Sequence, residues 1–259
     1  MKAWQWDKLT PVQKLVATIA GVGFQDELKH TRLFFRRDLR QINLTGARLT
    51  QADLSESDLS SARLDRADLR KVNLQGTKLQ GTVLWKANLS WIEGARCDLR
   101  LAMLESADLT EADLTDARLT SARASGAIFM RADLSGAALE GVDLDEAILE
   151  STDLAGANLR IASLRGASLP LANLDGANLD GAKLDGADLR GASFDGTRFE
   201  NALLEGARFG EEDEEPDGTP LKSILSQRTV APPPSRDQLL AAKWSSLVLG
   251  GRPVARTEL

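Results

Sequence analysis

The sequence predicts an all-β solenoid, a stack of short coils whose backbones pair in parallel from one coil to the next. Leucine or phenylalanine recurs at every fifth residue from Leu39 to Phe209, and only Gly94 and Ala124 break this series of 35 centre residues. A small residue, usually alanine, stands two places before each centre. A period of five fits neither the 3.6-residue period of a helix nor the two-residue period of a strand.

The repeat also predicts which side chains point inward. Two of every five residues are apolar, one large and one small, and we expect both to face a narrow interior that two large side chains would overpack. The other three residues face outward. Backbone groups then find partners in the neighbouring coils. Residues 37–211 are therefore predicted to form one rod.

The individual repeats resemble those of pentapeptide-repeat proteins. Two that carry the resemblance are Ala107-Asp108-Leu109-Thr110-Glu111 and Ala187-Asp188-Leu189-Arg190-Gly191. The resemblance implies a right-handed quadrilateral parallel β-helix with four repeats, or twenty residues, in each coil. At four repeats in each coil, the 35 repeats would make about nine coils. With roughly 4.8 Å between paired strands, the rod would have a length on the order of 40 Å.

Residues 1–36 do not follow the repeat and are predicted to form a helical cap. Thr10 and Pro11 suit the start of a helix, and Val12, Leu15, Val16 and Ile19 follow at helical spacing. Such a cap would cover the open end of the core. In the alternative interpretation, Trp4 and Trp6 are an exposed anchor for a partner.

After the rod the composition changes three times. Residues 212–235 are predicted to be an acidic and Pro-rich linker with a possible short helix, 236–249 an amphipathic helix, and 250–259 a flexible tail. The short α-helical segments would thus lie at both ends of the rod. As in members of the family that it resembles, the last helix would cap the rod or join two chains as a homodimer. Its apolar stripe consists of Leu240, Trp244, Leu247 and Val248.

Two local irregularities are expected inside the rod. At Gly94 the large centre side chain is missing, and Ile92, large at a place that is usually small, is expected to compensate within a bulge or a rearranged corner. From Gly126 onward many repeats end in glycine, which predicts type II turns there and other corners where Ser, Arg or Glu ends the repeat.

If residues twenty apart share a side, one side is acidic. Its only basic residue at an outward place is Arg96. The net charge of the whole chain is only −6, yet the negative charge is concentrated on this one side, which gives it a negative electrostatic potential. This side is a candidate partner-binding face. The alternative is a solvated face, because Asp is common at the place before each centre. The acidic residues are Asp53, Glu56, Glu93, Asp113, Asp116, Asp133, Asp153, Asp175 and Asp195.

Another side carries apolar residues at outward places. Ile128 and Ile148, twenty residues apart, are expected to stack directly. An outward apolar patch usually marks a contact surface, either for a partner or for a terminal segment of the same chain. The candidate contact residues are Trp91, Ile128, Met130, Ile148, Pro170 and Leu171.

Catalytic and metal-binding patterns are missing from the sequence. The only histidine is His30, outside the rod, and the only cysteine is Cys97, at an inward place where packing is the expected role. No Cys/His spacing suggests a metal site, and the glycines do not form a phosphate-binding loop. We therefore expect a non-enzymatic protein without a cofactor or metal.

The sequence also constrains location and partners. One cysteine is typical of a reducing compartment. No signal peptide is expected, because charged residues interrupt the first apolar run, and no run reaches the length of a membrane span. A cytoplasmic location is therefore expected. Direct binding of nucleic acid is not expected, because the rod lacks a basic stripe.

Two functions fit this pattern. The first is a protein-interaction scaffold that presents its apolar side to an as yet unknown protein partner. The second follows from the family resemblance, since quinolone-resistance members resemble duplex DNA in size and charge and bind DNA gyrase or topoisomerase IV. The acidic side would support such DNA mimicry.

Overall fold

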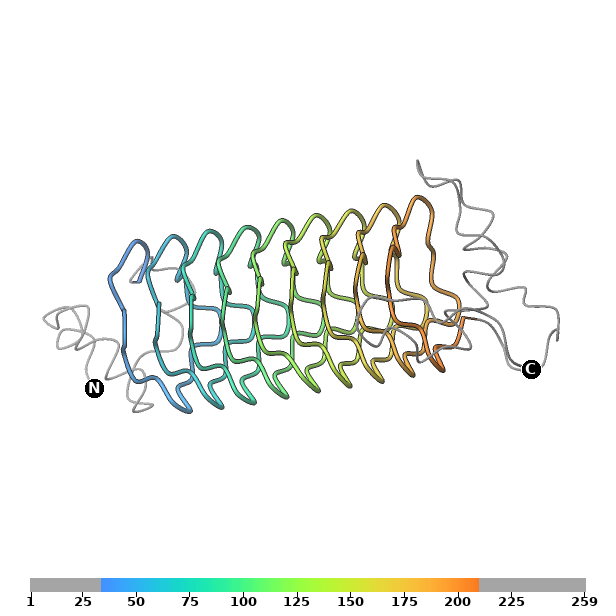
Figure 1. Cartoon of the computed structure of the whole chain (residues 1–259). Helices are drawn as coiled ribbons and strands as arrows, with labels where there is room; N and C mark the ends of the chain where they lie inside the picture. The colour runs from blue at the N-terminus through green and yellow to red at the C-terminus, as the bar shows by residue number, and fades with distance from the viewer. Residues whose placement is uncertain (1–33, 210–259) are drawn as a thin grey trace, which may run out of the picture.

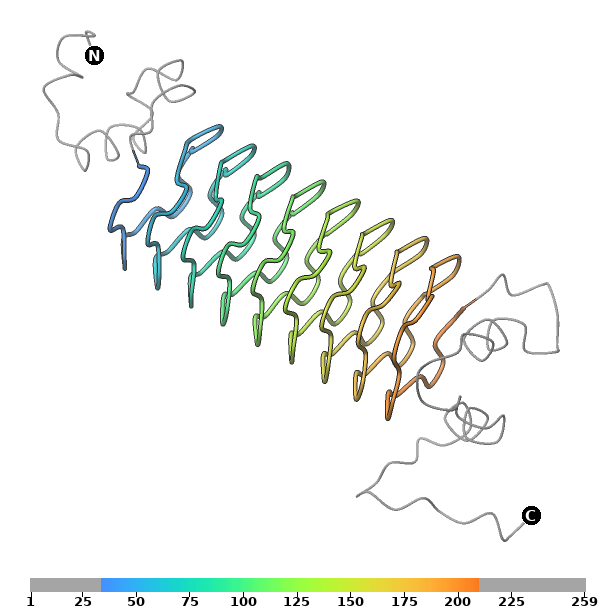
Figure 2. The same cartoon turned by 90° about the horizontal axis from the view of Figure 1, so that it is seen from above.

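The computed structural model describes residues 34–209, which form one straight rod of stacked coils (Figures 1 and 2). The first and last described residues lie at opposite ends of the rod. No α-helix and no strand longer than a single bridging residue occurs within 34–209. The helices predicted within 1–36 and 236–249, and the linker and tail around the latter, lie outside the described residues, apart from the last three residues of the first segment.

The coil contains four repeats. The residue before each centre makes a parallel bridge with the residue twenty further along, from Asp38 with Asp58 to Asp188 with Arg208. This spacing confirms that residues twenty apart share a side. We number the sides by the first residue of each bridged column, which is Asp38 for side 1, Asn43 for side 2, Arg48 for side 3 and Asp53 for side 4.

Backbone hydrogen bonds hold the coils together along every side. The amide of Leu44 donates to the carbonyl oxygen of Arg63 at 2.7 Å, and the amide of Arg63 donates to that of Ile42 at 2.8 Å. At the corner, the amide of Ala47 donates to the carbonyl oxygen of Leu44 at 2.9 Å. Because this pattern repeats along the rod, the buried backbone groups are satisfied by neighbouring coils and turns.

Every corner has the same backbone conformation. Every fifth residue from Arg36 to Gly206, which from Gln41 onward is the second residue after each centre, has a φ between +51° and +70°, and 21 of these residues are not glycine. The prediction that only glycine-ended repeats form such corners is therefore wrong. The hydrogen bonds between coils fix one corner geometry, and a non-glycine residue adopts it although the left-handed region costs roughly 1–2 kcal/mol.

This cost predicts a stabilising substitution. Ser121 has a φ of +56° and is exposed, so Ser121→Gly is expected to raise the free energy of unfolding by about 1 kcal/mol. Urea unfolding of the two proteins measures the difference. The control is Thr120→Gly, one residue earlier, where φ is not positive. Glycine should give no gain there, and equal gains at both places would contradict the explanation.

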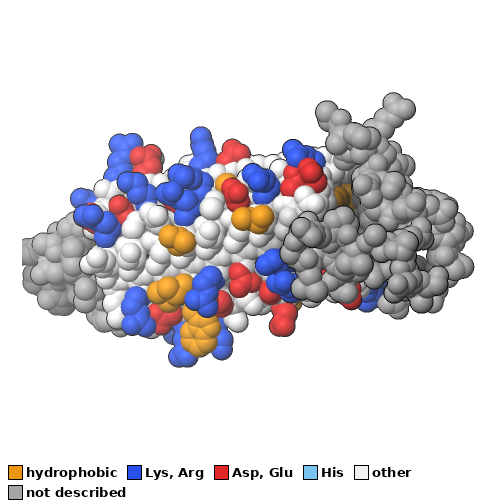
Figure 3. All heavy atoms as spheres, viewed as in Figure 1, with side chains coloured by type: hydrophobic (Ala, Val, Ile, Leu, Met, Phe, Trp, Pro, Cys, Tyr) orange, Lys and Arg blue, Asp and Glu red, His pale blue; other side chains and the backbone are white. Residues whose placement is uncertain are grey.

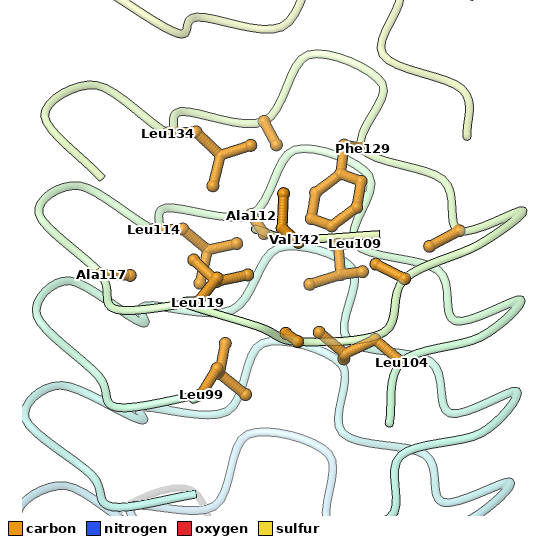
Figure 4. Packing of buried hydrophobic residues seen from close by; sticks show 14 of the residues in the cluster. Leu99, Leu104, Leu109, Ala112, Leu114, Ala117, Leu119, Phe129, Leu134 and Val142 are labelled. Carbon is orange, nitrogen blue, oxygen red and sulfur yellow. The ribbon is translucent and has the colours of Figure 1, made fainter. Parts of the chain in front are cut away.

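The core runs along the whole rod and consists of the centre residues and the small residues. Figure 4 shows leucines from successive repeats, Leu99, Leu104, Leu109 and Leu114, pointing into one interior, with Phe129 stacked in the column of Leu109. All five are fully buried. The inward assignment of the repeat is thus confirmed.

Some repeats have a threonine in place of the small inward residue, and its buried hydroxyl is hydrogen-bonded. The hydroxyl of Thr77 donates to the carbonyl oxygen of Leu54 at 2.9 Å, and that of Thr152 donates to the carbonyl oxygen of Phe129 at 2.7 Å. Both threonines are buried. A hydroxyl can therefore replace an alanine methyl inside the rod because a corner carbonyl of the preceding coil accepts its hydrogen bond.

The irregular repeat at Gly94 keeps the regular backbone. Ile92 is buried, and its Cδ1 would lie 3.3 Å from a Cβ added to Gly94, so it occupies the space next to the missing side chain. Glu93 still bridges Asn73 and Asp113. The expected compensation by Ile92 is confirmed, whereas the expected bulge or rearranged corner is wrong, because the isoleucine supplies volume without disturbing the hydrogen bonds.

Candidate interaction surfaces

The aspartates before the centres have a structural task at the corners. Asp113 Oδ1 accepts hydrogen bonds from the backbone amide of Thr115 at 3.0 Å and from its hydroxyl at 2.8 Å. An asparagine does the same, since Asn43 Oδ1 accepts from the amide of Thr45 at 3.0 Å. The side chain thus satisfies the one amide of the repeat that the coils leave unpaired.

Arginine reinforces some of these corners. The guanidinium of Arg190 donates to both carboxylate oxygens of Asp188, at 2.8 and 2.6 Å, and these hydrogen bonds hold the pKa of Asp188 below its usual value. The Arg70 guanidinium lowers the pKa of Asp68 in the same way. Sequence reasoning missed this capping role, although Asp or Asn followed two residues later by Ser or Thr was a visible signal for it.

Side 4 brings most of the predicted acidic residues together. Asp53, Glu93, Asp113, Asp133 and Asp153 belong to its bridged column, interrupted by Asn73 and continued by Asn173. The other four lie at the corner that follows this side. Glu56 and Asp116 occupy the positive-φ place of that corner, and Asp175 and Asp195 occupy the place before it.

The acidic groups of side 4 are poorly neutralised. Glu56 pairs with Arg36 at 2.5 Å, whereas acids on other sides often have an arginine nearby, such as Asp98 with Arg100 at 2.5 Å. Seven carboxylates of side 4 and of the corner that follows it have no cationic side chain within 4.0 Å in the part of the chain that the structure describes. These are Glu93, Asp113, Asp116, Asp133, Asp153, Asp175 and Asp195.

Side 3 contains the predicted apolar pair. Ile128 and Ile148 bridge each other in adjacent coils, with Ile128 half-buried and Ile148 37% exposed. Met130, half-buried, stands at the corner two residues after Ile128. These three residues form a small apolar surface on two neighbouring coils.

The remaining predicted apolar residues lie apart from that pair. Pro170 and Leu171 stand at the same corner two coils beyond Met130, and the polar Glu150 and Ser151 occupy the coil between them. Leu171 also leans away, because its Cδ2 would lie 2.8 Å from a Cβ on Gly191 in the next coil. The structure thus divides the predicted apolar set into separate groups.

Trp91 belongs to a ladder of corner residues between sides 3 and 4. Its indole Nε1–H donates to Glu111 at 2.9 Å, and Glu111 pairs with Arg131 at 3.6 Å in the next coil. On the other flank, Lys71 Nζ lies 5.6 Å from the centre of the Trp91 ring. Although Trp91 is 45% exposed, its polar atom already has a partner within the chain.

Sequence reasoning missed three exposed apolar side chains. They are Leu101, Met103 and Ile161, which lie on side 2 or at the corner before it. Their signal was available, since each occupies a place of the repeat that points outward. On the face in Figure 3, orange side chains form a few small groups on the white surface, bordered by charged side chains.

Cys97 is a buried packing residue. Burial, with a smaller effect of Asp98 and Asp113, raises the pKa of its thiol to about 12. We therefore predict that iodoacetamide at pH 8 leaves the folded protein unmodified and labels it only in urea, because the thiolate is the reactive form. Mass spectrometry measures the label, and rapid modification of the folded protein would contradict this assignment.

Within residues 34–209, no group of three or more His, Cys, Asp and Glu side chains is placed to hold a metal ion. Nor does the same stretch contain a helix with the length and apolarity that crossing a membrane requires. The stripe predicted at the other end of the chain, Leu240, Trp244, Leu247 and Val248, lies outside the described residues.

Comparisons with known proteins agree with the repeat. A family model described as pentapeptide repeats matches in eight copies, over residues 38–76, 67–90, 73–110, 97–136, 127–169 and 172–210. A comparison with curated proteins gave no match.

Several solved structures are similar. HetL, a pentapeptide repeat protein involved in heterocyst differentiation regulation from the cyanobacterium Nostoc sp. strain PCC 7120, is 32% identical over 70% of this chain and 92% of its own, with a TM-score of 0.33. Rfr23 from the cyanobacterium Cyanothece 51142 is 40% identical over 39% of this chain and 61% of its own, with a TM-score of 0.26. QnrB1, a plasmid-mediated fluoroquinolone resistance protein, is 19% identical over 69% of this chain and 87% of its own, with a TM-score of 0.34.

Proposed function

This chain belongs to the pentapeptide repeat family, and we propose that it is a non-enzymatic scaffold that binds a partner protein on the surface of its rod. Members of this family form right-handed quadrilateral β-helices, which are rigid because hydrogen bonds join every coil to its neighbours. Such a rod presents flat sides at fixed orientations. Recognition would then depend on the side chains that each side displays.

One observation carries the proposal, the stacked pair of Ile128 and Ile148 on side 3. Neither residue is needed at this place for the fold, because Asp, Asn, Ser and Arg occupy it elsewhere in the same column. An exposed isoleucine beside another in the next coil is a small apolar surface that a partner can cover. The two isoleucines are therefore the proposed centre of the contact.

Affinity purification from the native host tests this contact. Wild type and Ile148→Asp serve as baits, and mass spectrometry identifies the proteins retained by each. We expect Ile148→Asp to lose a partner that wild type retains, since a carboxylate at the centre of an apolar contact must be desolvated. The matched control is Asn158→Asp, which adds the same charge to side 1 on the opposite flank. Partners retained equally by all three baits would refute the proposed contact.

The second candidate is mimicry of duplex DNA toward DNA gyrase or topoisomerase IV, and the unpaired carboxylates of side 4 favour it. Asp113, Asp133 and Asp153 stack in consecutive coils, which gives a line of negative charge at intervals of about 4.8 Å. A basic DNA-binding surface would be attracted to such a line.

A variant that removes negative charge from side 4 but retains the hydrogen bonds at the corners tests mimicry. Asp113→Asn with Asp133→Asn removes two charges, while asparagine retains the hydrogen bond to the turn amide, as Asn43 shows. Mimicry predicts that purified gyrase binds wild type, that the double variant binds much more weakly, and that added salt weakens binding. Salt-insensitive binding, or equal binding of both proteins, would reject mimicry.

The proposed homodimer concerns residues outside the described part of the chain. The stripe of Leu240, Trp244, Leu247 and Val248 would pair with its copy in a second chain. Sedimentation velocity of the full chain and of Trp244→Asp tests this. A dimer that the substitution converts to a monomer supports the pairing, and a full chain that sediments as a monomer rejects it.

A further inference from the structure

A second apolar cluster lies on side 2. Val83 and Met103 bridge each other in adjacent coils, and Leu101 occupies the corner just before Met103. Trp85, half-buried, follows Val83 at the next corner. Leu101 is 55% exposed and Met103 is 37% exposed. Four apolar side chains of two neighbouring coils thus line one side of the rod, and we call them the side-2 cluster.

Leu101 occupies an unfavourable place for a leucine. Its φ is +58°, in the left-handed region that is disfavoured for bulky residues. The neighbours in the same corner column are Gly81 and Ser121, so the fold does not require an apolar side chain there. An exposed leucine at a place where glycine and serine suffice points to a contact outside the chain.

Basic side chains surround the side-2 cluster. Arg63 bridges Val83 on one flank, and Arg123 bridges Met103 on the other. Each has one acidic neighbour, Asp65 at 3.3 Å and Glu105 at 2.8 Å, yet both side chains remain more than half exposed. They can therefore accept a further carboxylate at the surface.

Two more cations lie over the indole of Trp85. The guanidinium carbon of Arg66 is 4.9 Å from the ring centre, and Lys86 Nζ is 4.4 Å from it. In the described part of the chain neither Arg66 nor Lys86 has a carboxylate within 4.0 Å. A ring already faced by two cations is poorly available for stacking against a nucleotide base, whereas the cations themselves remain available to carboxylates.

From these contacts we infer that the side-2 cluster binds an acidic segment of a partner protein that also carries apolar side chains. Leucine-like side chains of the segment would cover Leu101 and Met103, and its carboxylates would pair with Arg66, Lys86 and the flanking arginines. Arginine and tryptophan are also enriched among the residues that dominate binding energy. This surface lies opposite side 4 and next to side 3, so it is distinct from both surfaces proposed above and does not depend on them.

Fluorescence anisotropy with a synthetic peptide tests the inference on the full chain. The probe is a labelled peptide of glutamate, leucine and serine, and two matched peptides carry lysine for every glutamate or serine for every leucine. We expect only the peptide with both glutamate and leucine to bind measurably. Equal binding of the lysine peptide would refute charge recognition, and equal binding of the serine peptide would refute apolar recognition.

Variants assign the binding to this surface. Leu101→Ser with Met103→Ser is expected to weaken binding at least tenfold, and Arg66→Gln with Lys86→Gln is expected to weaken it and to reduce its salt dependence. Leu171→Ser, which removes an exposed leucine from the corner between sides 3 and 4, is the control and should bind like wild type. Circular dichroism verifies that each variant is folded. Unchanged binding by both double variants, or displacement of the peptide by single-stranded DNA, would overturn the inference.

Discussion

Leu134→Ala is expected to lower the free energy of unfolding by about 2–5 kcal/mol. Leu134 is fully buried and lies directly beyond Leu114 in the column that Figure 4 shows. Hydrogen bonds between the coils hold them at a fixed spacing. For example, the Leu134 amide donates to the backbone carbonyl oxygen of Asp153 at 2.7 Å. The rod therefore cannot collapse around the cavity, and most of the loss should appear in the measured stability.

Urea unfolding followed by circular dichroism measures this loss. Ile148→Ala is the control, because it removes an aliphatic side chain of similar size from an exposed outward place. It should change stability by less than about 1 kcal/mol. Equal losses for the two variants would contradict the assignment of centre residues to the interior and of bridging residues to the surface.

The second large effect is expected at the irregular repeat. Ile92→Ala should cost about 2–5 kcal/mol, because it leaves the space beside Gly94 empty. Gly94→Leu should also be destabilising, since a Cβ there would lie 3.0 Å from the backbone oxygen of Asp113 and 3.3 Å from Ile92 Cδ1. The two residues share one volume and are expected to be strongly coupled.

The double variant Ile92→Ala with Gly94→Leu restores the usual repeat, with a small residue followed by a large centre. We expect it to be more stable than either single variant, with a coupling energy on the order of 1–3 kcal/mol in a double-mutant cycle. The same urea titration measures all four proteins. Additive losses would mean that Ile92 does not compensate for the missing centre side chain.

Most of the fold was predictable because the repeat encodes it directly. The period located Leu44 and its equivalents in the core, and the family resemblance supplied the coil length. The corners were mispredicted, because the preference of glycine for positive φ was treated as decisive. Residues such as Ile161, at a φ of +51°, show that the hydrogen bonds between coils override this preference.

The surfaces were less predictable, because they depend on contacts between residues twenty apart. The sequence placed Asp113 and Asp133 on one side, but not their hydrogen bonds to the corners. Likewise, Trp91 was assigned to an apolar face, whereas its indole donates to Glu111 in the next coil. Leu101 was not predicted, because a single apolar residue at an outward place is normal on a protein surface and does not by itself indicate a contact.

All face assignments depend on the twenty-residue register, and paired cysteines test it most directly. In a Cys97→Ala background, Ile128→Cys with Ile148→Cys places two thiols on bridged residues about 4.8 Å apart, within the range for a disulfide. The control, Ile128→Cys with Asp143→Cys, places them on adjacent sides. We expect mild oxidation to close the first pair almost completely and the second hardly at all, as measured by thiol titration and mass spectrometry. Efficient closure of the control pair, with the first pair left open, would contradict the register and every surface derived from it.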